Sequence, residues 1–236
     1  MILNTRPKIL SKSLNKLAQD QSLKIINAHL SDIEPTIEEK NLIELELKLK
    51  NISSYKNIIF TSQAAVIHGL PFINRFITNG EWNIFSIGPA TKGMLLNNGV
   101  DSISPSNSSS EDILNLIEKD YPGKNLLFCG DNSNNYLQGK LKENIDEIIC
   151  YKLVYNKLEL DKVSNEPKII LIYNFLTFSF LFKSLDHEIL KDKIFIVISE
   201  RVKDKIQSLS KSLNLRVYVT KEPSDSSMLE VAKNLT

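Results

Sequence analysis

Short apolar runs alternate with helical patterns along almost the whole chain. Residues 58–62 (IIFTS) pass from apolar to hydroxyl residues, residues 84–91 (IFSIGPAT) pass from apolar residues to a Gly-Pro step, and a helical pattern follows each. Glycine suits a helix N-cap, and proline suits the first helical position. Because strand-to-helix junctions in series are typical of βα units, we expect an α/β fold with mostly parallel sheets.

Several predicted helices carry start or stop signals. Residues 36–39, 109–112 and 227–230 each place Ser or Thr three positions before Glu or Asp, which is a capping pattern. Ser199 precedes another helical segment, and Gly99 suits a helix end. The apolar residues that we expect on the buried helix faces are Leu42, Leu45, Leu49, Ile113, Leu116, Ile117, Val202, Ile206, Leu209, Leu213, Met228, Val231, Ala232 and Leu235.

Segments of the chain recur further along it. The matching segments are 58–63 with 169–174, 84–90 with 194–200, 105–114 with 223–229, and 1–6 plus 24–28 with 125–131 plus 147–151. The members of each pair share their order of apolar, polar and helical stretches. This indicates an internal duplication whose period is far too long for a solenoid.

The duplication predicts two domains. Residues 35–150 supply one complete α/β domain, which leaves residues 1–30 to pack with residues 157–236 in a discontinuous domain. Linkers at about 29–35 and 151–157 then join the two domains. Two adjacent crossings of this kind favour a hinge with a cleft between the domains, and such clefts are common ligand sites.

Composition and charge narrow the choice of partners. A hydrophobic content of 42% allows a sizeable core, and 29 Lys and Arg against 28 Asp and Glu give a net charge of +1. This balance argues against a nucleic acid or an anionic membrane as partner. No apolar run approaches the ~18 residues of a membrane span, and charged residues interrupt the apolar start, so we expect a cytoplasmic protein without a signal peptide.

Several common site motifs are missing. The sequence has no GxGxxG, no GK[ST] and no GxSxG, which argues against nucleotide-phosphate and hydrolase chemistry by those routes. His29, His68 and His187 are far apart without metal-binding spacing, so we expect no metal site and assign them surface or capping positions. Cys129 and Cys150 lie in apolar runs, where buried thiols are favoured over a disulfide.

Two strand ends are candidates for binding an anion. Thr61 and Ser62 follow one predicted strand, and residues 88–91 follow the next. The first N–H groups of a helix have no acceptor within the helix, so they can bind an anion. Ser or Thr before a helix is also a common N-cap, which is the alternative at both places. Because open α/β sheets bind ligands at the carboxyl ends of their strands, a carboxylate site stays open.

Two further side chains could act at the same ligand. Arg6 follows the first strand and could hold a carboxylate bidentately, although a salt bridge or a surface position is the simpler interpretation. Tyr151 lies at the predicted domain crossing, where packing is the usual role of a tyrosine. Its phenol could instead donate a proton to a bound ligand, and no Asp, His or Cys constellation competes for that role.

In these motifs the chain resembles the uroporphyrinogen-III synthase family. The motifs that carry the resemblance are Asn4-Thr5-Arg6-Pro7, Ile59-Phe60-Thr61-Ser62 with Ala65-Val66, Ile87-Gly88-x-Ala90-Thr91 with Leu95, Leu126 to Gly130 with Leu137, Tyr151, and Pro223-Ser224-x-Ser226-x-Met228-Leu229. They extend over nearly the whole length, in order and with the expected spacing. The resemblance implies two flavodoxin-like parallel-sheet domains, one of them discontinuous, joined by a two-stranded linker with a cleft between them.

The resemblance also implies a reaction. Such an enzyme is a lyase that closes hydroxymethylbilane, a linear tetrapyrrole with eight carboxylates, with loss of water and inversion of the last pyrrole ring through a spiro intermediate. The product is uroporphyrinogen III, the asymmetric macrocycle used for haem. No cofactor is implied, and we expect a monomer with at most a transient contact to the preceding enzyme of the pathway. Because the substrate also closes unaided to the symmetric isomer, the enzyme chiefly holds a conformation.

The resemblance assigns roles to residues of this chain. Tyr151 is the implied catalytic residue. The implied substrate-binding residues are Arg6, Thr61, Ser62, Gln63, Gly88, Pro89, Ala90, Thr91, Gly130, Asn174 and Ser199. The second half departs from the family pattern: Asn174 to Leu176 replace a Ser-Pro-Ser-like turn, Ser199 and Val202 replace Gly and Thr, and residues 132–135 lack an Arg.

Two other functions fit the same pattern. A non-catalytic binding or sensor module could also close two hinged α/β domains on a small acidic ligand, so the fold does not separate it from the enzyme. The expected absence of a signal peptide and of a DNA-binding segment counts against that module. A degenerate homologue with a purely structural role is the third alternative.

Overall fold

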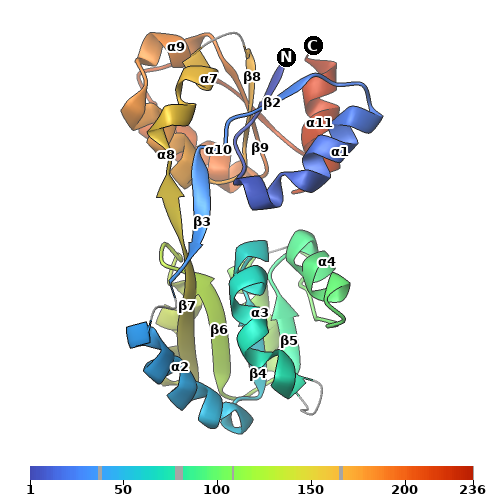
Figure 1. Cartoon of the computed structure of the whole chain (residues 1–236), viewed down its shortest axis with the longest axis vertical. Helices are drawn as coiled ribbons and strands as arrows, with labels where there is room; N and C mark the ends of the chain where they lie inside the picture. The colour runs from blue at the N-terminus through green and yellow to red at the C-terminus, as the bar shows by residue number, and fades with distance from the viewer. Residues whose placement is uncertain (37–38, 78–81, 108, 165–166, 236) are drawn as a thin grey trace. The chain divides into compact units, whose positions relative to one another are not determined.

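The chain divides into two compact units. The structure, a computed structural model, describes residues 1–36, 39–77, 82–107, 109–164 and 167–235. Unit 1 comprises Met1–Asp32 and Val154–Thr236, and unit 2 comprises Ile33–Leu153. The first unit is therefore discontinuous in sequence, and the second is inserted into it. Figure 1 shows a sheet flanked by helices in each unit.

The sheet of unit 1 contains two distant parts of the sequence. Its order is β10-β9-β8-β1-β2, and every pair of neighbours is parallel. The strands are β1 (Ile2–Asn4), β2 (Ile25–Asn27), β8 (Ile169–Ile172), β9 (Ile194–Val197) and β10 (Arg216–Val219). Because β1 pairs with both β2 and β8, the N-terminal segment completes the sheet of the C-terminal segment.

The sheet of unit 2 has the order β3-β7-β6-β4-β5. Its strands are β3 (Ser31–Pro35), β4 (Asn57–Phe60), β5 (Asn83–Ser86), β6 (Asn125–Gly130) and β7 (Ile145–Tyr155). The ladders of β4 with β5 and β6, and of β6 with β7, are parallel. At the β3 edge, Asn156 N–H donates to the Leu30 carbonyl and Thr36 N–H to the Cys150 carbonyl, so β3 and β7 run antiparallel.

The two sheets share one topology. Beside β5, Phe85 pairs in parallel with Ile103, which occupies the place that β10 has in unit 1. With β6 and β7 taken as the first two strands of unit 2, both sheets have the order 2-1-3-4-5, which is the flavodoxin-like order. The predicted fold class, two parallel α/β sheets, is therefore confirmed. In this order ligands bind where the strand order reverses, between β1 and β8 in unit 1 and between β6 and β4 in unit 2.

Helices cover both faces of each sheet. They are α1 (Lys12–Asp20), α2 (Glu39–Lys50), α3 (Gln63–Ile77), α4 (Pro89–Asn97), α5 (Ser110–Asp120), α6 (Tyr136–Leu141), α7 (Asp161–Ser164), α8 (Phe175–Ser184), α9 (His187–Lys191), α10 (Glu200–Leu209) and α11 (Asp225–Asn234), with 3-10 turns η1 (Lys8–Leu10), η2 (Ile52–Ser54), η3 (Lys142–Asn144) and η4 (Lys157–Glu159). In unit 1, α8 and α10 pack on one face, and α1 and α11 pack on the other.

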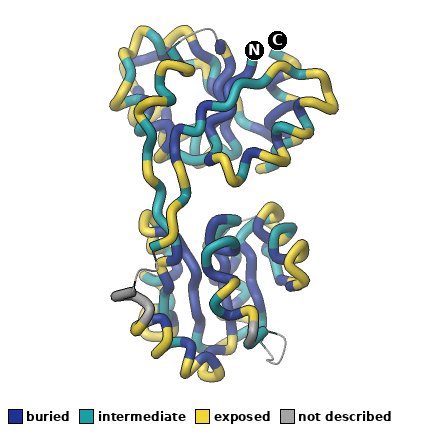
Figure 2. Tube along the Cα trace, viewed as in Figure 1, coloured by how far each residue is buried: buried dark blue, intermediate teal, exposed yellow. Residues whose placement is uncertain are grey.

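Two core layers enclose the sheet of unit 2. We call the side covered by α2, α3 and α4 the α3 face, and the side covered by α5 and α6 the α5 face. Every residue of β4, β6 and β8 is buried, and Figure 2 shows dark blue, buried segments inside each unit. Strands buried on both sides are expected to be apolar throughout, which explains the continuous apolar runs of the sequence.

Most predicted helix signals are confirmed, and two are wrong. Ser109 is the N-cap of α5, and its hydroxyl accepts from the Asp112 N–H. The last helix begins at Asp225, because Ser224 rather than Ser227 is its N-cap. The helix α10 ends at Leu209, which is 37% exposed, so Leu213 lies beyond the helix and not on its face. The capping pattern at residues 36–39 lies partly outside the described residues, and so does the side chain of Leu42.

Two other expectations were tested. Cys129 and Cys150 are both free and buried, and burial raises the pKa of each thiol to about 12. The disulfide alternative is therefore wrong. Within the part of the chain that the structure describes, no helix is long and apolar enough to cross a membrane.

Candidate functional site

A serine and a tyrosine meet at the strand ends of unit 2. Ser62 follows β4, and Tyr151 lies in β7, on the other side of β6. The Ser62 Oγ and the Tyr151 Oη are 3.0 Å apart, and either can donate. Ser62 also caps α3, because its Oγ accepts from the Ala65 N–H at 3.1 Å. The N-cap reading of Ser62 is thus confirmed, and the same hydroxyl also contacts Tyr151.

Tyr151 is partly buried against the α3 face of the sheet. Burial raises the pKa of its phenol above the ordinary value, while the hydrogen bond with Ser62 opposes the rise and the nearby Asp131 carboxylate adds to it. Since the ordinary value is about 10, the phenol is protonated at neutral pH. The side chain therefore packs on the core and presents an O–H at the strand ends.

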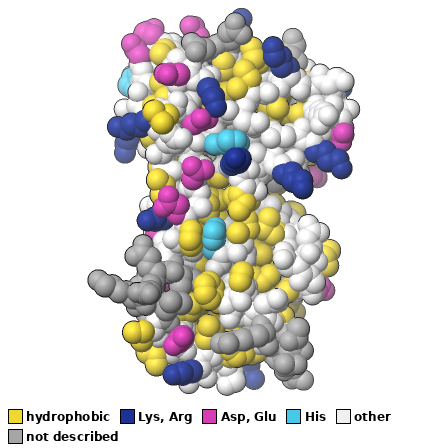
Figure 3. All heavy atoms as spheres, viewed as in Figure 1, with side chains coloured by type: hydrophobic (Ala, Val, Ile, Leu, Met, Phe, Trp, Pro, Cys, Tyr) yellow, Lys and Arg dark blue, Asp and Glu magenta, His cyan; other side chains and the backbone are white. Residues whose placement is uncertain are grey.

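His68 of α3 is a neighbour of Tyr151 that sequence reasoning missed. The ring centroids of His68 and Tyr151 are 6.5 Å apart. The His68 Nε2 is buried and has no hydrogen-bond partner among the described residues, and burial lowers the pKa of the ring. Figure 3 shows hydrophobic side chains gathered on the visible face of unit 2. The His68 side chain as a whole is only partly buried, so nothing here contradicts a position at the surface.

The start of α4 has a glycine, which carries no side chain, at its N-cap. Gly88 is its N-cap, makes no side-chain hydrogen bond and is followed by Pro89 at the first helical position. Thr91 lies in the first turn and is 5% exposed, and no described residue forms a hydrogen bond with its hydroxyl. Gly99, with φ of 77°, lies just beyond the helix end, as predicted. The α4 start therefore keeps backbone N–H groups and one hydroxyl without a side-chain cap.

The remaining predicted residues of unit 2 lie beside these groups. The Thr61 N–H and hydroxyl both contact the Phe128 carbonyl at 3.2 Å, so Thr61 ties β4 to β6. Gln63 is the first residue of α3, and Gly130 ends β6. Gly130 is the register partner of Tyr151. These residues therefore surround the switch point of the unit 2 sheet.

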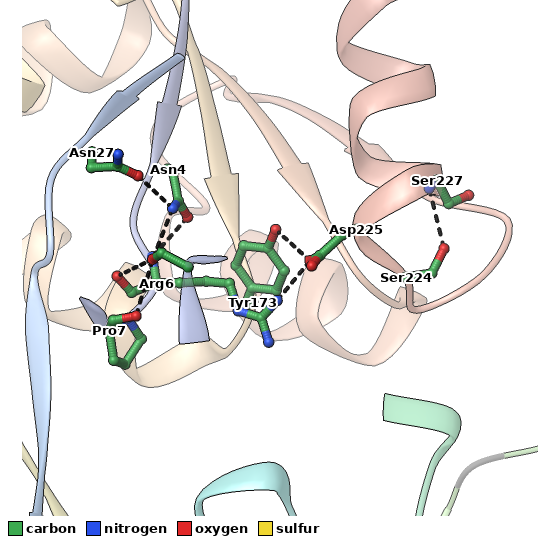
Figure 4. A network of polar contacts seen from close by, with 9 residues as sticks. Asn4, Arg6, Pro7, Asn27, Tyr173, Ser224, Asp225 and Ser227 are labelled. Carbon is green, nitrogen blue, oxygen red and sulfur yellow. Dashed lines mark hydrogen bonds and ion pairs between the residues drawn. The ribbon is translucent and has the colours of Figure 1, made fainter. Parts of the chain in front are cut away.

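The strand ends of unit 1 are joined by an ion pair. The Arg6 Nη1 lies 2.6 Å from the Asp225 Oδ1, and each side chain is 11% exposed. The Tyr173 hydroxyl donates to the same Asp225 oxygen at 3.1 Å, and the Arg6 guanidinium lies 4.4 Å from the Tyr173 ring centroid. Figure 4 shows the three side chains converging from β1, β8 and α11. The salt-bridge reading of Arg6 is therefore confirmed.

The network around Arg6 holds both charges in place. Asp225 is the first residue of α11, where the helix dipole favours a negative charge. Burial and the Asp225 carboxylate raise the pKa of Tyr173 far above its ordinary value, so its hydroxyl stays a donor. Behind Arg6, the Asn4 amide donates to Asn27 at 2.8 Å and to Ser11 at 3.0 Å (Figure 4). Sequence reasoning did not name Tyr173 or Asp225 as site residues.

Asn174 and Ser199 both act as helix N-caps. The Asn174 Oδ1 accepts from the Thr177 N–H at 2.8 Å, and the Ser199 Oγ accepts from the Val202 N–H at 3.4 Å. Asn174 precedes α8 in the way that Ser62 precedes α3, which agrees with the duplication. Within the described residues, nothing accepts a hydrogen bond from the Asn174 amide nitrogen. The Asn174 amide nitrogen and the Ser199 hydroxyl can therefore each still donate a hydrogen bond.

The comparison with protein families decides the assignment. A family model described as uroporphyrinogen-III synthase HemD matches residues 12–230. The chain belongs to the uroporphyrinogen-III synthase family. Members of this family are lyase-type enzymes of tetrapyrrole biosynthesis, as the sequence motifs predicted. Among curated protein sequences, none matches the chain.

Solved structures of two uroporphyrinogen III synthases are similar to the chain. A mutant enzyme from Thermus thermophilus has a TM-score of 0.65 at 12% identity, with 99% of this chain and 97% of that chain covered. The enzyme from Helicobacter pylori has a TM-score of 0.60 at 15% identity, with 100% and 99% covered. At such low identity these likenesses support the two-domain fold of the family.

The described residues offer no ready metal site. No group of three or more His, Cys, Asp or Glu side chains among them is arranged to hold a metal ion. Of the residues predicted from the family motifs, the structure brings together Ser62, Gly130 and Tyr151 in unit 2. In unit 1 it joins Arg6 to Asp225, which the motifs did not suggest.

Proposed function

We propose that the strand ends of unit 2 carry the chemistry of the family reaction in this chain. In that reaction hydroxymethylbilane loses water and closes to uroporphyrinogen III with inversion of its last pyrrole ring. The observation that carries the proposal is the contact of 3.0 Å between Ser62 and Tyr151. It fixes a protonated phenol at a switch point, where open α/β sheets bind ligands.

Tyr151 is the proposed proton donor. The Ser62 oxygen already accepts the Ala65 N–H, and its own proton can be donated to the Tyr151 oxygen. The Tyr151 proton is then available for the substrate hydroxyl, which leaves as water while a pyrrole nitrogen supplies the electron pair. Ser62 also stabilises the phenolate that this step produces, consistent with its lowering effect on the Tyr151 pKa. A proton released on ring closure restores the phenol.

Neutral donors are proposed to bind the substrate carboxylates. The α4 start offers the Gly88, Ala90 and Thr91 groups beside Pro89. Gln63 begins α3, whereas both donors of Thr61 already contact the Phe128 carbonyl, so Thr61 can bind a carboxylate only by giving up that contact. Helix N-termini favour anions without a full positive charge. Such binding suits a protein of net charge +1 and a substrate with eight carboxylates.

Unit 1 is proposed to contribute more weakly. The Arg6 Nη1 already contacts the Asp225 carboxylate, so a substrate carboxylate that takes this position must displace Asp225. The net gain from such an exchange is small, since one charge-assisted hydrogen bond replaces another. Asn174 and Ser199 can donate further hydrogen bonds while they cap their helices.

The substrate conformation is the main thing that such an enzyme must control. Holding the reacting carbons together lowers the barrier to the inverting path, and few acid or base groups are needed. We propose that the chain does this as a cytoplasmic monomer without a cofactor. It receives its substrate from the preceding enzyme, in a contact that is at most transient.

The test is a direct assay of the product isomers. The protein is incubated with freshly generated hydroxymethylbilane, and the isomers are separated after oxidation to porphyrins. We expect mainly the asymmetric isomer, against mainly the symmetric isomer in a control without protein. If the two mixtures are the same while the protein still binds the product, the chain is a binding module and the proposed reaction is wrong.

A further inference from the structure

The ladder between β6 and β7 contains a bulge at Cys150. Cys129 pairs with Ile149, but Gly130 pairs with Tyr151, so Cys150 has no partner of its own. A bulge of this kind turns the following side chain to the other face of the sheet, and bulges are common next to active sites. The register therefore changes at the last residue of β6.

The bulge decides which face of the sheet carries Tyr151. Ile148 and Cys150 face the α3 side, so a regular strand would turn Tyr151 to the α5 side, where Cys129 packs. Instead, Tyr151 packs on the α3 side together with Cys150. Only on that side can its phenol reach Ser62, which starts α3.

Gly130 leaves the space that the phenol occupies. A Cβ atom at position 130 would lie 2.6 Å from the Tyr151 Cζ, 2.8 Å from its Cε2 and 2.9 Å from its Oη. All three distances are below van der Waals contact, so the end of the ring rests directly on the glycine backbone. Any larger residue here would push the phenol away from its present position.

The backbone conformation at position 130 does not require a glycine. The glycines with positive φ among the described residues are Gly99 and Gly123, and Gly130 is not one of them. An alanine can therefore adopt the backbone conformation at 130. A glycine is required at position 130 because the Tyr151 side chain occupies the space of a Cβ atom, and not because of backbone strain.

We propose that Gly130, opposite the bulge at Cys150, is the positioning residue that sets the Tyr151 hydroxyl against Ser62. The inference rests on the proposed function, in which Tyr151 donates the proton, and it gives Gly130 a role different from direct substrate binding. Because the atoms in conflict belong to the far end of a side chain, Gly130→Ala should fold and swing the ring aside. The loss should then appear in turnover rather than in stability.

The test compares Gly130→Ala with Gly139→Ala. Gly139 lies in α6, its φ is not positive, and a Cβ there meets nothing within 4 Å, so it controls for the change of residue type. Both variants are made with 3-fluorotyrosine, and the fluorine resonance of Tyr151 is identified by its loss in Tyr151→Phe. We expect this resonance to shift, and turnover to fall at least about tenfold, in Gly130→Ala only. The thermal midpoints should stay within a few degrees of wild type.

The fluorine signal separates the inference from the proposed function. An unmoved resonance in Gly130→Ala would overturn the positioning role. A shifted resonance with full turnover would support the positioning role and remove Tyr151 from the chemistry. If Gly130→Ala does not fold, the double variant Gly130→Ala/Tyr151→Ala is compared with Tyr151→Ala. If the two variants are equally stable, the clash of the new Cβ with the Tyr151 ring explains why Gly130→Ala did not fold. If only the double variant does not fold, glycine is needed at position 130 for the backbone itself, which overturns the inference.

Discussion

The two units share one sheet topology, but the side chains at their strand ends differ in charge. In unit 1 a guanidinium and a carboxylate from this chain neutralise each other, and Tyr173 holds the pair through its ring and its hydroxyl. In unit 2 the corresponding place has a phenol bonded to a neutral hydroxyl. Because both sheets have the order 2-1-3-4-5, this difference comes from side chains and not from the fold.

The difference shows how a nearly neutral protein can bind an anion with many charges. A paired Arg6 has its strongest partner already in place, so a substrate carboxylate gains little by displacing Asp225. An uncapped helix start, such as that of α4, has no internal anion to displace. We therefore expect variants at the unit 2 strand ends to change turnover and binding, and variants at the unit 1 strand ends to change stability.

The largest effect is expected from Tyr151→Phe. The change removes only the hydroxyl, so the fold should persist, while the loss of a positioned acid should lower turnover at least tenfold and up to about 10⁴-fold. The measurement is the rate of formation of the asymmetric isomer.

Tyr173→Phe is the matched control, because it removes the phenol at the strand ends of unit 1. This variant loses the hydrogen bond to Asp225 and should keep turnover within about threefold while losing about 1 kcal/mol of stability. Equal losses of turnover in the two variants would contradict the division between the units. Full turnover in Tyr151→Phe would assign Tyr151 to packing.

The next largest effect is expected from Asp225→Asn. It removes the carboxylate that pairs with the nearly buried Arg6 guanidinium, and breaking a buried pair in this way costs about 3 kcal/mol of unfolding free energy. Urea unfolding at neutral pH measures it.

Glu188→Gln serves as the control for this variant. Its partner Lys191 lies at the same distance of 2.6 Å, but the two side chains are 75% and 43% exposed, so the loss should stay below about 1 kcal/mol. Similar losses at the two pairs would mean that the Arg6 pair is no more important than a surface pair.

A smaller effect is expected from Thr91→Val. Volume is kept while one donor is lost, so product binding should weaken by about 1 to 3 kcal/mol if the partner carboxylate stays desolvated. Isothermal titration with product measures the affinity, and the isomer ratio is recorded in parallel.

Thr177→Val makes the same change in the first turn of α8, in unit 1. Its hydroxyl contacts Asn174 at 3.1 Å, so this variant should lose stability and keep its affinity for product. Unchanged affinity and an unchanged isomer ratio in Thr91→Val would remove Thr91 from the site.

Local signals in the sequence predicted much of the fold. Helix starts depend on residues three or four positions apart, so Ser109 and the step from Gly88 to Pro89 could be recognised directly. The flavodoxin-like order of the strands was implied by the family resemblance, whereas the duplication predicted only how the chain divides. The start of α11 was misplaced by three residues, since Ser227 has Glu230 three positions later and fits the cap pattern, whereas the actual N-cap, Ser224, is followed at that distance by Ser227.

The contacts of the site could not be read from local patterns. Arg6 and Asp225 are separated by 219 positions, and Ser62 and Tyr151 by 89, so only the folded sheet brings them together. The bulge at Cys150 has no signature in the sequence, and it alone decides the face of Tyr151. One difference between the repeated loops did point to Asp225. The first loop, at residues 105–114, has the neutral Asn107 at the position where the second loop, at residues 223–229, has the charged Asp225.

The smallest effect is expected from the titration of His68. Burial lowers the pKa of its ring in the folded protein, whereas the ring in the unfolded chain has the ordinary pKa of about 6.5. The unfolded state then binds more protons, and stability must fall as the pH drops below about 6.5 and be fully regained above it. His68→Gln removes this group and should flatten the dependence between pH 7.5 and 5 by less than about 1 kcal/mol, because the ring is partly exposed. Urea unfolding of both proteins at the two pH values measures the slope, and an equal or steeper slope in His68→Gln would show that the buried nitrogen beside Tyr151 gains a partner when it is protonated.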